Sequence, residues 1–259
     1  MLSHDHAHAW IERWDRQQEG YLPDREERFT ALVDAVETGR PDPVVIDLGC
    51  GPGSLSARLL RRLPAATVIA VDTDPLLLAL GRAEYGSLPG LRFVDRDLRE
   101  PGWTEALDLP RPADVAVSTT ALHWLPEPVL KNVYAELAGA LGPGGMYLNG
   151  DHFAVPDTAP RLDALEAALG ARAAERLFAG GRPEDWQSWW AAASADPELE
   201  ALNLDRERRR ASAAHHGSES GRLSTHVDAL RAAGFTEIGT LWQRGNDRIL
   251  CALLPEKPE

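Results

Sequence analysis

Hydrophobic positions divide much of the chain into short apolar runs that alternate with segments of helical spacing. The apolar and β-branched runs predict strands at Val44–Leu48, Thr67–Val71, Leu91–Val94, Asp114–Ser118 and Met146–Asn149. Helical spacing separates these runs near 54–63, 75–84 and 126–141. Strands that alternate with helices pair in parallel through right-handed crossovers. The pattern therefore predicts an α/β fold with a doubly wound, mostly parallel sheet.

The two ends of the chain have their own patterns. Residues 6–18 and 23–37 predict two N-terminal helices, broken by Gly20 and Pro23. A helix from Leu223 leads to two strand-like runs at Glu237–Gln243 and Arg248–Leu254. Between these runs, Gly245-Asn246 is typical of a two-residue hairpin turn. We therefore expect an antiparallel hairpin to complete a sheet of seven strands.

The segment 152–222 has a different pattern from the rest of the chain. It is rich in alanine, contains Trp186, Trp189 and Trp190, and has no convincing strand pattern. We interpret it as a set of helices inserted into the order of the sheet.

The first predicted strand ends in the most informative motif of the sequence. Asp47 is followed by Gly49, Gly51 and Gly53, which remove the Cβ atom at alternate positions of a tight turn. A helical pattern begins at the next residue. A strand, a glycine turn and a helix N-terminus together form a nucleotide-type binding site.

The register of the glycines discriminates among nucleotide classes. The dinucleotide fingerprint requires the spacing Gly-x-Gly-x-x-Gly. Gly49 and Gly51 match its first two glycines, but Ser54 occupies the position of the third. The chain has no Gly-Lys-Ser or Gly-Lys-Thr, so it lacks the phosphate-binding P-loop. The motif therefore suits a nucleoside ligand without a phosphate to bind.

Composition and charge limit the possible binding partners and the possible cellular compartments of the protein. The net charge of −13 disfavours nucleic-acid partners, because phosphate contacts supply most of that affinity. Two cysteines form no disulfide framework and indicate a reducing, cytoplasmic location. The sequence has neither the pattern of a signal peptide nor an apolar run long enough to span a membrane, so we expect no membrane association.

Six motifs in order resemble those of class I S-adenosylmethionine-dependent methyltransferases. They are Asp47-Leu-Gly-Cys-Gly-Pro-Gly, Val68-Ile-Ala-Val-Asp72, Arg92-Phe-Val-Asp-Arg-Asp97-Leu98, Asp114–Trp124, Leu141-Gly-Pro-Gly-Gly145 and Ala233-Gly-Phe235. Ala121-Leu-His-Trp-Leu-Pro126 is similar to the small-molecule branch that includes trans-aconitate methyltransferase. The nucleic-acid branch usually has an Asn- or Asp-Pro-Pro-aromatic motif after the fourth strand, where this chain has Ser118-Thr-Thr-Ala. The resemblance implies a Rossmann-like methyltransferase fold.

The resemblance also implies a set of cofactor residues for S-adenosylmethionine. Asp72 would accept hydrogen bonds from both ribose hydroxyls, since a carboxylate can bind a vicinal diol. Asp97 and the following amide would hold the adenine, while Asp47 would orient the glycine loop and approach the methionine ammonium. An arginine of the second helix would bind the methionine carboxylate, with Arg25 preferred to Arg28. The remaining cofactor candidates are Tyr21, Gly49, Cys50, Gly51, Thr73, Leu98 and Ser118.

Candidates for the acceptor side follow the fourth and fifth strands, where ligands bind in open α/β sheets. His123 and His152 are the candidate general bases, because histidine titrates near neutral pH. We expect Trp124 either to pack in the core or to separate the cofactor from the acceptor, and we expect Asp151 to lie on the substrate side. The other substrate-binding candidates are Trp186, His215 and His216.

Two clusters of charged or titratable residues have simpler interpretations. His4, His6 and His8 alternate along a helix and do not share one face, so we expect a solvated tract and no metal site. Arg206, Arg208, Arg209 and Arg210 are interpreted as a solvated helix end, with an anionic substrate as the alternative.

The sequence as a whole predicts four parts: an N-terminal helical cap (1–40), a cofactor-binding core (41–151), a helical lid over the acceptor site (152–222), and a helix and hairpin that complete the core (223–259). The expected reaction is in-line methyl transfer to a small-molecule acceptor, with oxygen, nitrogen and carbon all open as the nucleophile. Both a monomer and a homodimer also stay open. The alternatives are a nucleotide-dependent oxidoreductase, a cofactor-binding protein without transfer, and a protein or RNA methyltransferase.

Overall fold

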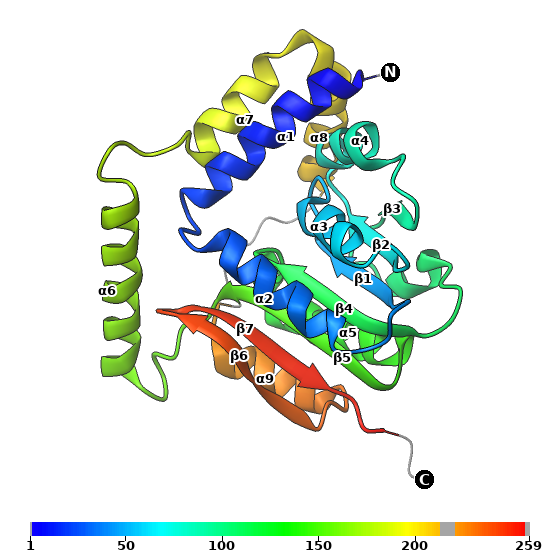
Figure 1. Ribbon diagram of the computed structural model, residues 1–259, viewed down its shortest axis with the longest axis vertical. Coiled ribbons are helices and arrows are strands. Elements are labelled where there is room, and N and C mark those ends of the chain that lie inside the picture. Colours follow the sequence, from blue (N-terminus) through cyan, green and yellow to red (C-terminus); the bar gives the residue numbers. More distant parts are fainter. Residues whose placement is uncertain (1, 213–220, 257–259) are drawn as a thin grey trace.

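A computed structural model describes residues 2–212 and 221–256. Its centre is a seven-stranded sheet in the order β3-β2-β1-β4-β5-β7-β6 (Figure 1). The strands are β1 (Val44–Leu48), β2 (Thr67–Asp72), β3 (Leu91–Asp95), β4 (Ala113–Thr119), β5 (Leu141–His152), β6 (Glu237–Arg244) and β7 (Asp247–Leu253). Neighbouring strands from β3 to β5 pair in parallel, and β7 pairs antiparallel with both β5 and β6. The predicted mostly parallel sheet with a terminal hairpin is confirmed.

The predicted elements agree closely with the structure, with one exception in the fifth strand. The segment Leu141–Gly145 was expected to be a turn before that strand, but β5 begins at Leu141. Leu141 pairs with Ala113, and the register then shifts before Val115 pairs with Met146. The glycines therefore lie in an irregular first part of the strand.

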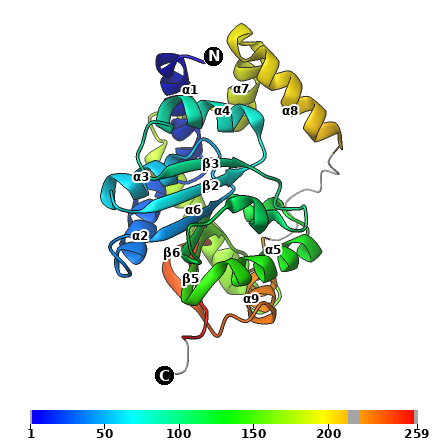
Figure 2. The same ribbon diagram turned by 90° about the vertical axis from the view of Figure 1, so that its right-hand side faces the viewer.

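Two layers of helices cover the sheet because its strands are apolar on both faces. One face carries α2 (Arg25–Glu37) and α3 (Ser54–Arg62), and the other carries α5 (Glu127–Ala140) and α9 (Leu223–Ala232) (Figures 1 and 2). In β1, Val45 packs toward the first layer, while Ile46 and Leu48 pack toward the second. A strand buried on both faces explains its continuous apolar run.

A third apolar cluster lies above the β1–β3 side of the sheet. It joins α1 (His4–Glu19), α4 (Pro75–Tyr85), α7 (Trp186–Ala195) and a short 3-10 turn at Pro197–Leu199. Tryptophans dominate it, with Trp189 fully buried and 5.3 and 5.0 Å from the ring centroids of Trp10 and Trp14. Aromatic rings of this size contribute much of the apolar area that holds the N-terminal helix to the inserted segment.

The inserted segment is helical within the described residues, as predicted. It contains α6 (Pro160–Leu177), α7 and α8 (Glu200–Ser212). In Figure 1, α6 stands to one side of the body, and its Glu166 forms a buried ion pair with Arg248 of β7. In Figure 2, α8 lies beside α4. Every described helix is too short or insufficiently apolar to cross a bilayer.

Candidate functional site

The glycine turn after β1 is held against the end of β2. The amides of Gly49 and Cys50 donate hydrogen bonds to the carbonyl of Val71, at 2.8 and 3.0 Å. Gly49, Gly51 and Gly53 have φ angles of 67°, 54° and 88°, a left-handed conformation that favours glycine. The turn therefore requires glycine at all three positions of the predicted motif.

The absence of a Cβ atom has different consequences at the three glycines of this turn. A Cβ on Gly49 would lie 2.4 Å from the Cβ of Ala121, and one on Gly53 would lie 2.8 Å from the Phe93 ring. At Gly51 the nearest atom would be Cζ2 of Trp14, at an ordinary 3.7 Å. Gly49 and Gly53 thus allow close internal packing, whereas at Gly51 only the left-handed backbone conformation favours glycine.

Asp72 at the end of β2 shapes the loop that follows it. Its carboxylate accepts hydrogen bonds from the amides of Gly51, Thr73 and Asp74, at 2.8, 2.7 and 2.8 Å. Burial raises the pKa of Asp72 to about 6, helped by the charge of Asp74 and opposed by these amides. Because a carboxylate can accept more than three hydrogen bonds, Asp72 can still accept one from a ligand.

Asp47 is buried beneath the glycine turn with one oxygen unsatisfied. Its Oδ2 accepts a 2.6 Å hydrogen bond from the hydroxyl of Ser56, while Oδ1 has no partner among the described residues. Burial raises the pKa of Asp47 to about 7, although the Ser56 hydrogen bond lowers it. An unpaired buried carboxylate is costly, so this oxygen is suited to a cationic ligand.

The other predicted cofactor residues lie around the same turn. Asp97 accepts hydrogen bonds from the Arg99 amide and guanidinium, which lower its pKa although burial alone would raise it. The hydroxyl of Ser118 donates to the carbonyl of Leu48, and burial raises the pKa of Cys50, so its thiol stays protonated. Leu98 packs at the edge of the core.

The two arginines of α2 have different positions. Arg25 is buried and pairs with Asp15 of α1 at 2.9 Å, beside the start of α3. Arg28 is fully buried and reaches the carboxyl end of β4, where its guanidinium donates to Thr119 Oγ1 at 2.6 Å and to Asp247 at 2.8 Å. Arg25 thus lies beside the start of α3 and Arg28 at the end of β4, and each has one buried nitrogen without a hydrogen-bond partner among the described residues.

Gly150 of β5 makes the position of Arg28 possible. A Cβ on Gly150 would lie 3.0 Å from Cδ and 3.1 Å from Nε of Arg28, and that Nε has no partner among the described residues. Beside it, Thr120 has a φ of 48° and donates its amide to the carbonyl of Gly150. Left-handed conformations of β-branched residues are rare and strained, and they cluster at functional sites.

His123 and Asp151 form a pair on the other side of this edge. Nδ1 of His123 lies 2.9 Å from both carboxylate oxygens of Asp151, which is almost fully buried. Burial alone would raise the pKa of Asp151, but the hydrogen bond and charge of His123 hold it below its usual value. Because Nδ1 faces the carboxylate, Nε2 is the nitrogen left to accept a proton.

His152 follows Asp151 in β5 and lines a cavity of about 330 Å³. Burial lowers the pKa of His152, which favours its neutral form. The cavity is lined by Gly20, Tyr21, Pro23, Asp24, His152, Ala167, Gly170, Ala171, Ala173, Ala174, Arg244, Asn246 and Asp247. Small residues of α6 thus form one wall, and the chain leading from α1 into α2 forms another.

Two predicted substrate residues, Trp124 and Trp186, and the predicted cofactor residue Tyr21 have other surroundings. Trp124 is 54% exposed and stacks near His123, so it does not belong to the core. Trp186 packs with Trp14 and Trp190 in the third apolar cluster. Tyr21 lies before α2 rather than on it, and its hydroxyl accepts a hydrogen bond from the Trp186 amide. His215 and His216 lie outside the described residues.

The N-terminal histidines make contacts that the sequence did not indicate. Nδ1 of His8 lies 2.9 Å from Glu84 of α4, and Nε2 of His4 lies 3.3 Å from the same carboxylate. His6 lies 2.9 Å from Asp196. His4 and His8 are nevertheless exposed, as predicted, and only His6 is partly buried, because α1 packs against the inserted segment on that side. No group of three or more candidate metal ligands occurs in the described ranges.

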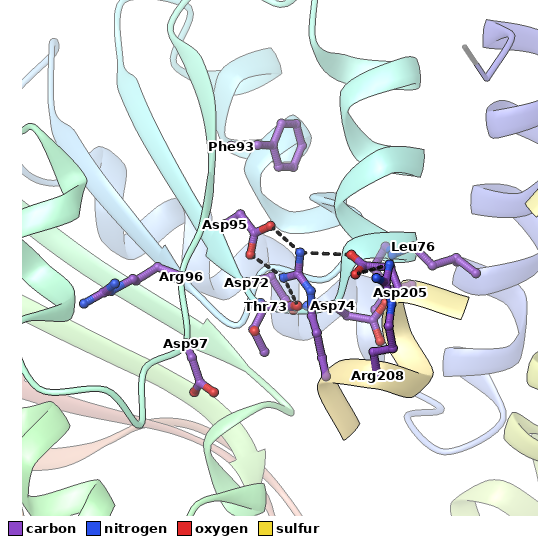
Figure 3. Close-up of polar contacts among 12 residues, drawn as sticks. Asp72, Thr73, Asp74, Leu76, Phe93, Asp95, Arg96, Asp97, Asp205 and Arg208 are labelled. Atoms are coloured by element: carbon purple, nitrogen blue, oxygen red, sulfur yellow. Dashed lines mark hydrogen bonds and ion pairs between the residues drawn. The ribbon is translucent and has the colours of Figure 1, made fainter. Parts of the chain in front are cut away.

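The prediction of a solvated arginine run was wrong for two of its members. Arg206 donates to Asp74 at 2.6 Å, and Arg209 donates to both oxygens of Asp95, at 2.7 and 3.0 Å (Figure 3). Arg208 is 77% exposed, as expected. Sequence analysis also missed Asp247, which lies more than two hundred residues from its partner Arg28 and has no local signal.

Comparison with known proteins identifies the family of the central segment. Residues 45–145 match the family described as "Methyltransferase domain". A trans-aconitate 2-methyltransferase of Azoarcus sp. strain BH72 is 35% identical over 135 residues, covering 51% of this chain and 48% of that protein. The corresponding protein of Deinococcus radiodurans is 34% identical over 133 residues, covering 51% and 47%. The chain thus spans about half the length of the curated relatives it matches.

Solved structures extend the likeness to most of the fold. The N-methyltransferase NodS from Bradyrhizobium japonicum matches 90% of this chain and 98% of its own, with a TM-score of 0.52 and 15% identity. Human N-acetylserotonin methyltransferase matches 88% of this chain and 51% of its own, with a TM-score of 0.53 and 17% identity. Identity this low establishes the fold alone. The central segment thus belongs to the methyltransferase domain family, and the described chain has the fold of known methyltransferases.

Proposed function

We propose that this protein transfers a methyl group from S-adenosylmethionine to a small-molecule acceptor. The observation that carries the proposal is the arrangement of Asp47 and Asp72 around the left-handed glycine turn. One buried carboxylate has an unsatisfied oxygen, and the other orders the loop at the end of β2. The names of the relatives, trans-aconitate 2-methyltransferases, agree with a small acceptor.

The residues fit the chemical groups of this cofactor. The unpaired Oδ1 of Asp47 suits the methionine ammonium, and Asp72 suits the ribose diol. The unpaired Nε of buried Arg28 suits the methionine carboxylate. Asp97, with Leu98, lies at the end of the next strand and suits the adenine edge. When bound, the cofactor supplies an electrophilic methyl group on a sulfonium.

The chain's own contribution is to orient the acceptor, exclude water and accept a proton. Correct alignment of reacting groups supplies on the order of 7–11 kcal/mol of barrier reduction in favourable cases. We place the acceptor at the carboxyl ends of β4 and β5, between His123 and the cavity that His152 and α6 line. In this proposal residues 1–40 and 152–222 cover the carboxyl ends of the strands.

His123 is the preferred general base for an acceptor that must lose a proton. The buried carboxylate of Asp151 orients its ring and stabilises the imidazolium that results, while Nε2 takes the proton. His152 is the weaker candidate because burial disfavours its charged form. An acceptor that is already ionised needs neither histidine.

The first experiment measures binding by calorimetry with S-adenosylhomocysteine and, separately, with a nicotinamide dinucleotide. We expect micromolar binding of the first and none of the second, and the reverse result would favour an oxidoreductase. A screen with methyl-labelled S-adenosylmethionine against small metabolites, tRNA and a protein lysate then identifies the acceptor class. Binding without any labelled product would overturn methyl transfer, and label only in RNA or protein would overturn the small-molecule acceptor.

A further inference from the structure

Helix α8 contacts the ends of β2 and β3 and the loop after β2, although 114 to 136 residues of sequence separate the contacting residues. Arg209 donates to both carboxylate oxygens of Asp95, the last residue of β3, and to the carbonyl of Thr73 at 3.0 Å. A planar guanidinium binds a carboxylate with two parallel bonds in this way, which fixes its orientation. Figure 3 shows these contacts at the ends of the two strands.

Arg206 makes a second connection, one turn earlier on the same helix. Its Nε donates to Oδ2 of Asp74 at 2.6 Å, and both side chains are largely buried. The guanidinium also lies over the Trp190 ring, 3.4 Å from its centroid. Oδ1 of Asp74 meanwhile caps α4 by accepting from the amides of Leu76 and Leu77. Arg206 therefore joins α8, α7 and the start of α4.

Both arginines act on the loop that contains Asp72. The amides of Thr73 and Asp74 bind the Asp72 carboxylate, while the Thr73 carbonyl and the Asp74 side chain bind α8. Asp72 and Asp95 also pair in register across β2 and β3. The inserted segment is thus connected directly to the two strand ends between which the adenosine is placed by the proposed function.

We propose that Arg206 and Arg209 are cofactor-retaining residues, which fix the β2 and β3 loops around the adenosine and slow its release. This inference rests on the proposed function, because it takes S-adenosylmethionine as the ligand of Asp72. Exchange of the cofactor then requires these ion pairs to open. Partly exposed ion pairs are individually weak, so they retain the ligand without trapping it.

The test measures the dissociation rate of S-adenosylhomocysteine by stopped-flow fluorescence, with the change in Trp190 fluorescence as the signal. Arg206→Gln and Arg209→Gln should each raise this rate about threefold, and the double variant about tenfold. Arg208→Gln is the matched control, because Arg208 lies on the same helix but contacts only Asp205 among the described residues. We expect the control to keep the wild-type rate.

A second variant removes one ion pair from the strand side. Asp95→Asn should raise the dissociation rate as much as Arg209→Gln does, and combining the two should add little. Hydrogen exchange gives an independent readout: S-adenosylhomocysteine should slow exchange in α8 of the wild type and much less in the Arg209→Gln variant. Thermal unfolding confirms that each variant is folded.

The outcomes separate this inference from the function on which it rests. If the wild type does not bind S-adenosylhomocysteine, both fall. If the wild type binds it and Arg209→Gln releases it at the rate of Arg208→Gln, the retaining role alone falls. Equal protection of α8 in the wild type and the Arg209→Gln variant would also overturn it.

Discussion

On the β1–β3 side of the sheet's carboxyl edge, backbone amides hold the carboxylate of Asp72, whereas on the β4–β7 side other side chains hold Asp151 and Asp247. Asp72 binds amides within its own loop and the glycine turn. Asp151 accepts one local amide, that of His152, but both of its oxygens also contact His123, and Asp247 binds Arg28. Local contacts build the proposed cofactor side, and contacts between distant segments build the proposed acceptor side. Mutations should therefore act differently on the two sides.

Arg28→Ala should have the largest effect on stability. It leaves Asp247 buried without its cation, and breaking such a pair costs about 3–5 kcal/mol. Urea unfolding measures the loss. The double variant Arg28→Met with Asp247→Leu should recover most of the stability but not the affinity for S-adenosylhomocysteine. An Arg28→Ala variant as stable as the wild type would contradict a structural pair at this edge.

Removing the His123–Asp151 pair should affect transfer without affecting cofactor binding. We expect His123→Gln to slow methyl transfer on the order of 100-fold with an acceptor that loses a proton. Asp151→Asn should slow it less and change its pH profile, because the asparagine no longer stabilises the imidazolium. Labelled-methyl assays and calorimetry measure the two properties. If His123→Gln and His152→Gln both retain full turnover, neither histidine is the base.

Asp47→Asn should stabilise the protein without ligand at pH 8 while weakening cofactor binding. The folded-state pKa of about 7 lies above the ordinary value of 3.8, so the folded protein holds this proton more tightly than the unfolded chain does. Wild-type stability should therefore fall as the pH rises from about 4 to 7, and the variant should lack this part of the loss. We expect a gain on the order of 2 kcal/mol at pH 8 and much less at pH 4.

Urea unfolding at both pH values, together with calorimetry at pH 8, tests this prediction. Equal gains at the two pH values would show that the Asp47 carboxylate is not the titrating group. Asp72 titrates in the same direction and range, so a smaller dependence on pH should persist in the variant.

Asp97→Asn should have the smallest effect, a loss of about fivefold in affinity for S-adenosylhomocysteine, equivalent to about 1 kcal/mol. The pKa of Asp97 is already below its usual value, so this loss should not vary between pH 5 and 8. Calorimetry across that range is the measurement. Arg99→Gln serves as the control for losing the ion pair with Asp97. A strong pH dependence of the loss would contradict an Asp97 carboxylate that is ionised throughout this range.

The cofactor side was largely predictable because its signals are local. A buried strand, the glycines at 49, 51 and 53, and acids at strand ends are adjacent in sequence to the elements that position them. Even here the sequence did not show what two of the glycines pack against. Gly49 and Gly53 make room for Ala121 and Phe93, and those neighbours arrive only with the folded sheet.

The acceptor side and the inserted segment were less predictable because their contacts are distant. The three-residue spacing of Arg25 and Arg28 does not show what surrounds each of them, whereas the packing of α2 directs Arg28 over Gly150. The arginines of α8 were predicted to be solvated because their partners, Asp74 and Asp95, lie on other elements and are distant in the sequence.

The sequence by itself determined the alternation of strands and helices, the terminal hairpin, and the glycine turn with its acids. These follow from hydrophobic periodicity and from backbone conformations that only glycine adopts readily. Only the tertiary structure decided which carboxylates pair with Arg25 and Arg28, which carboxylate holds His123, and which charges of α8 pair with the strand ends. Side-chain pairing between distant segments depends on the packing of the whole sheet, and no local pattern in the chain encodes it.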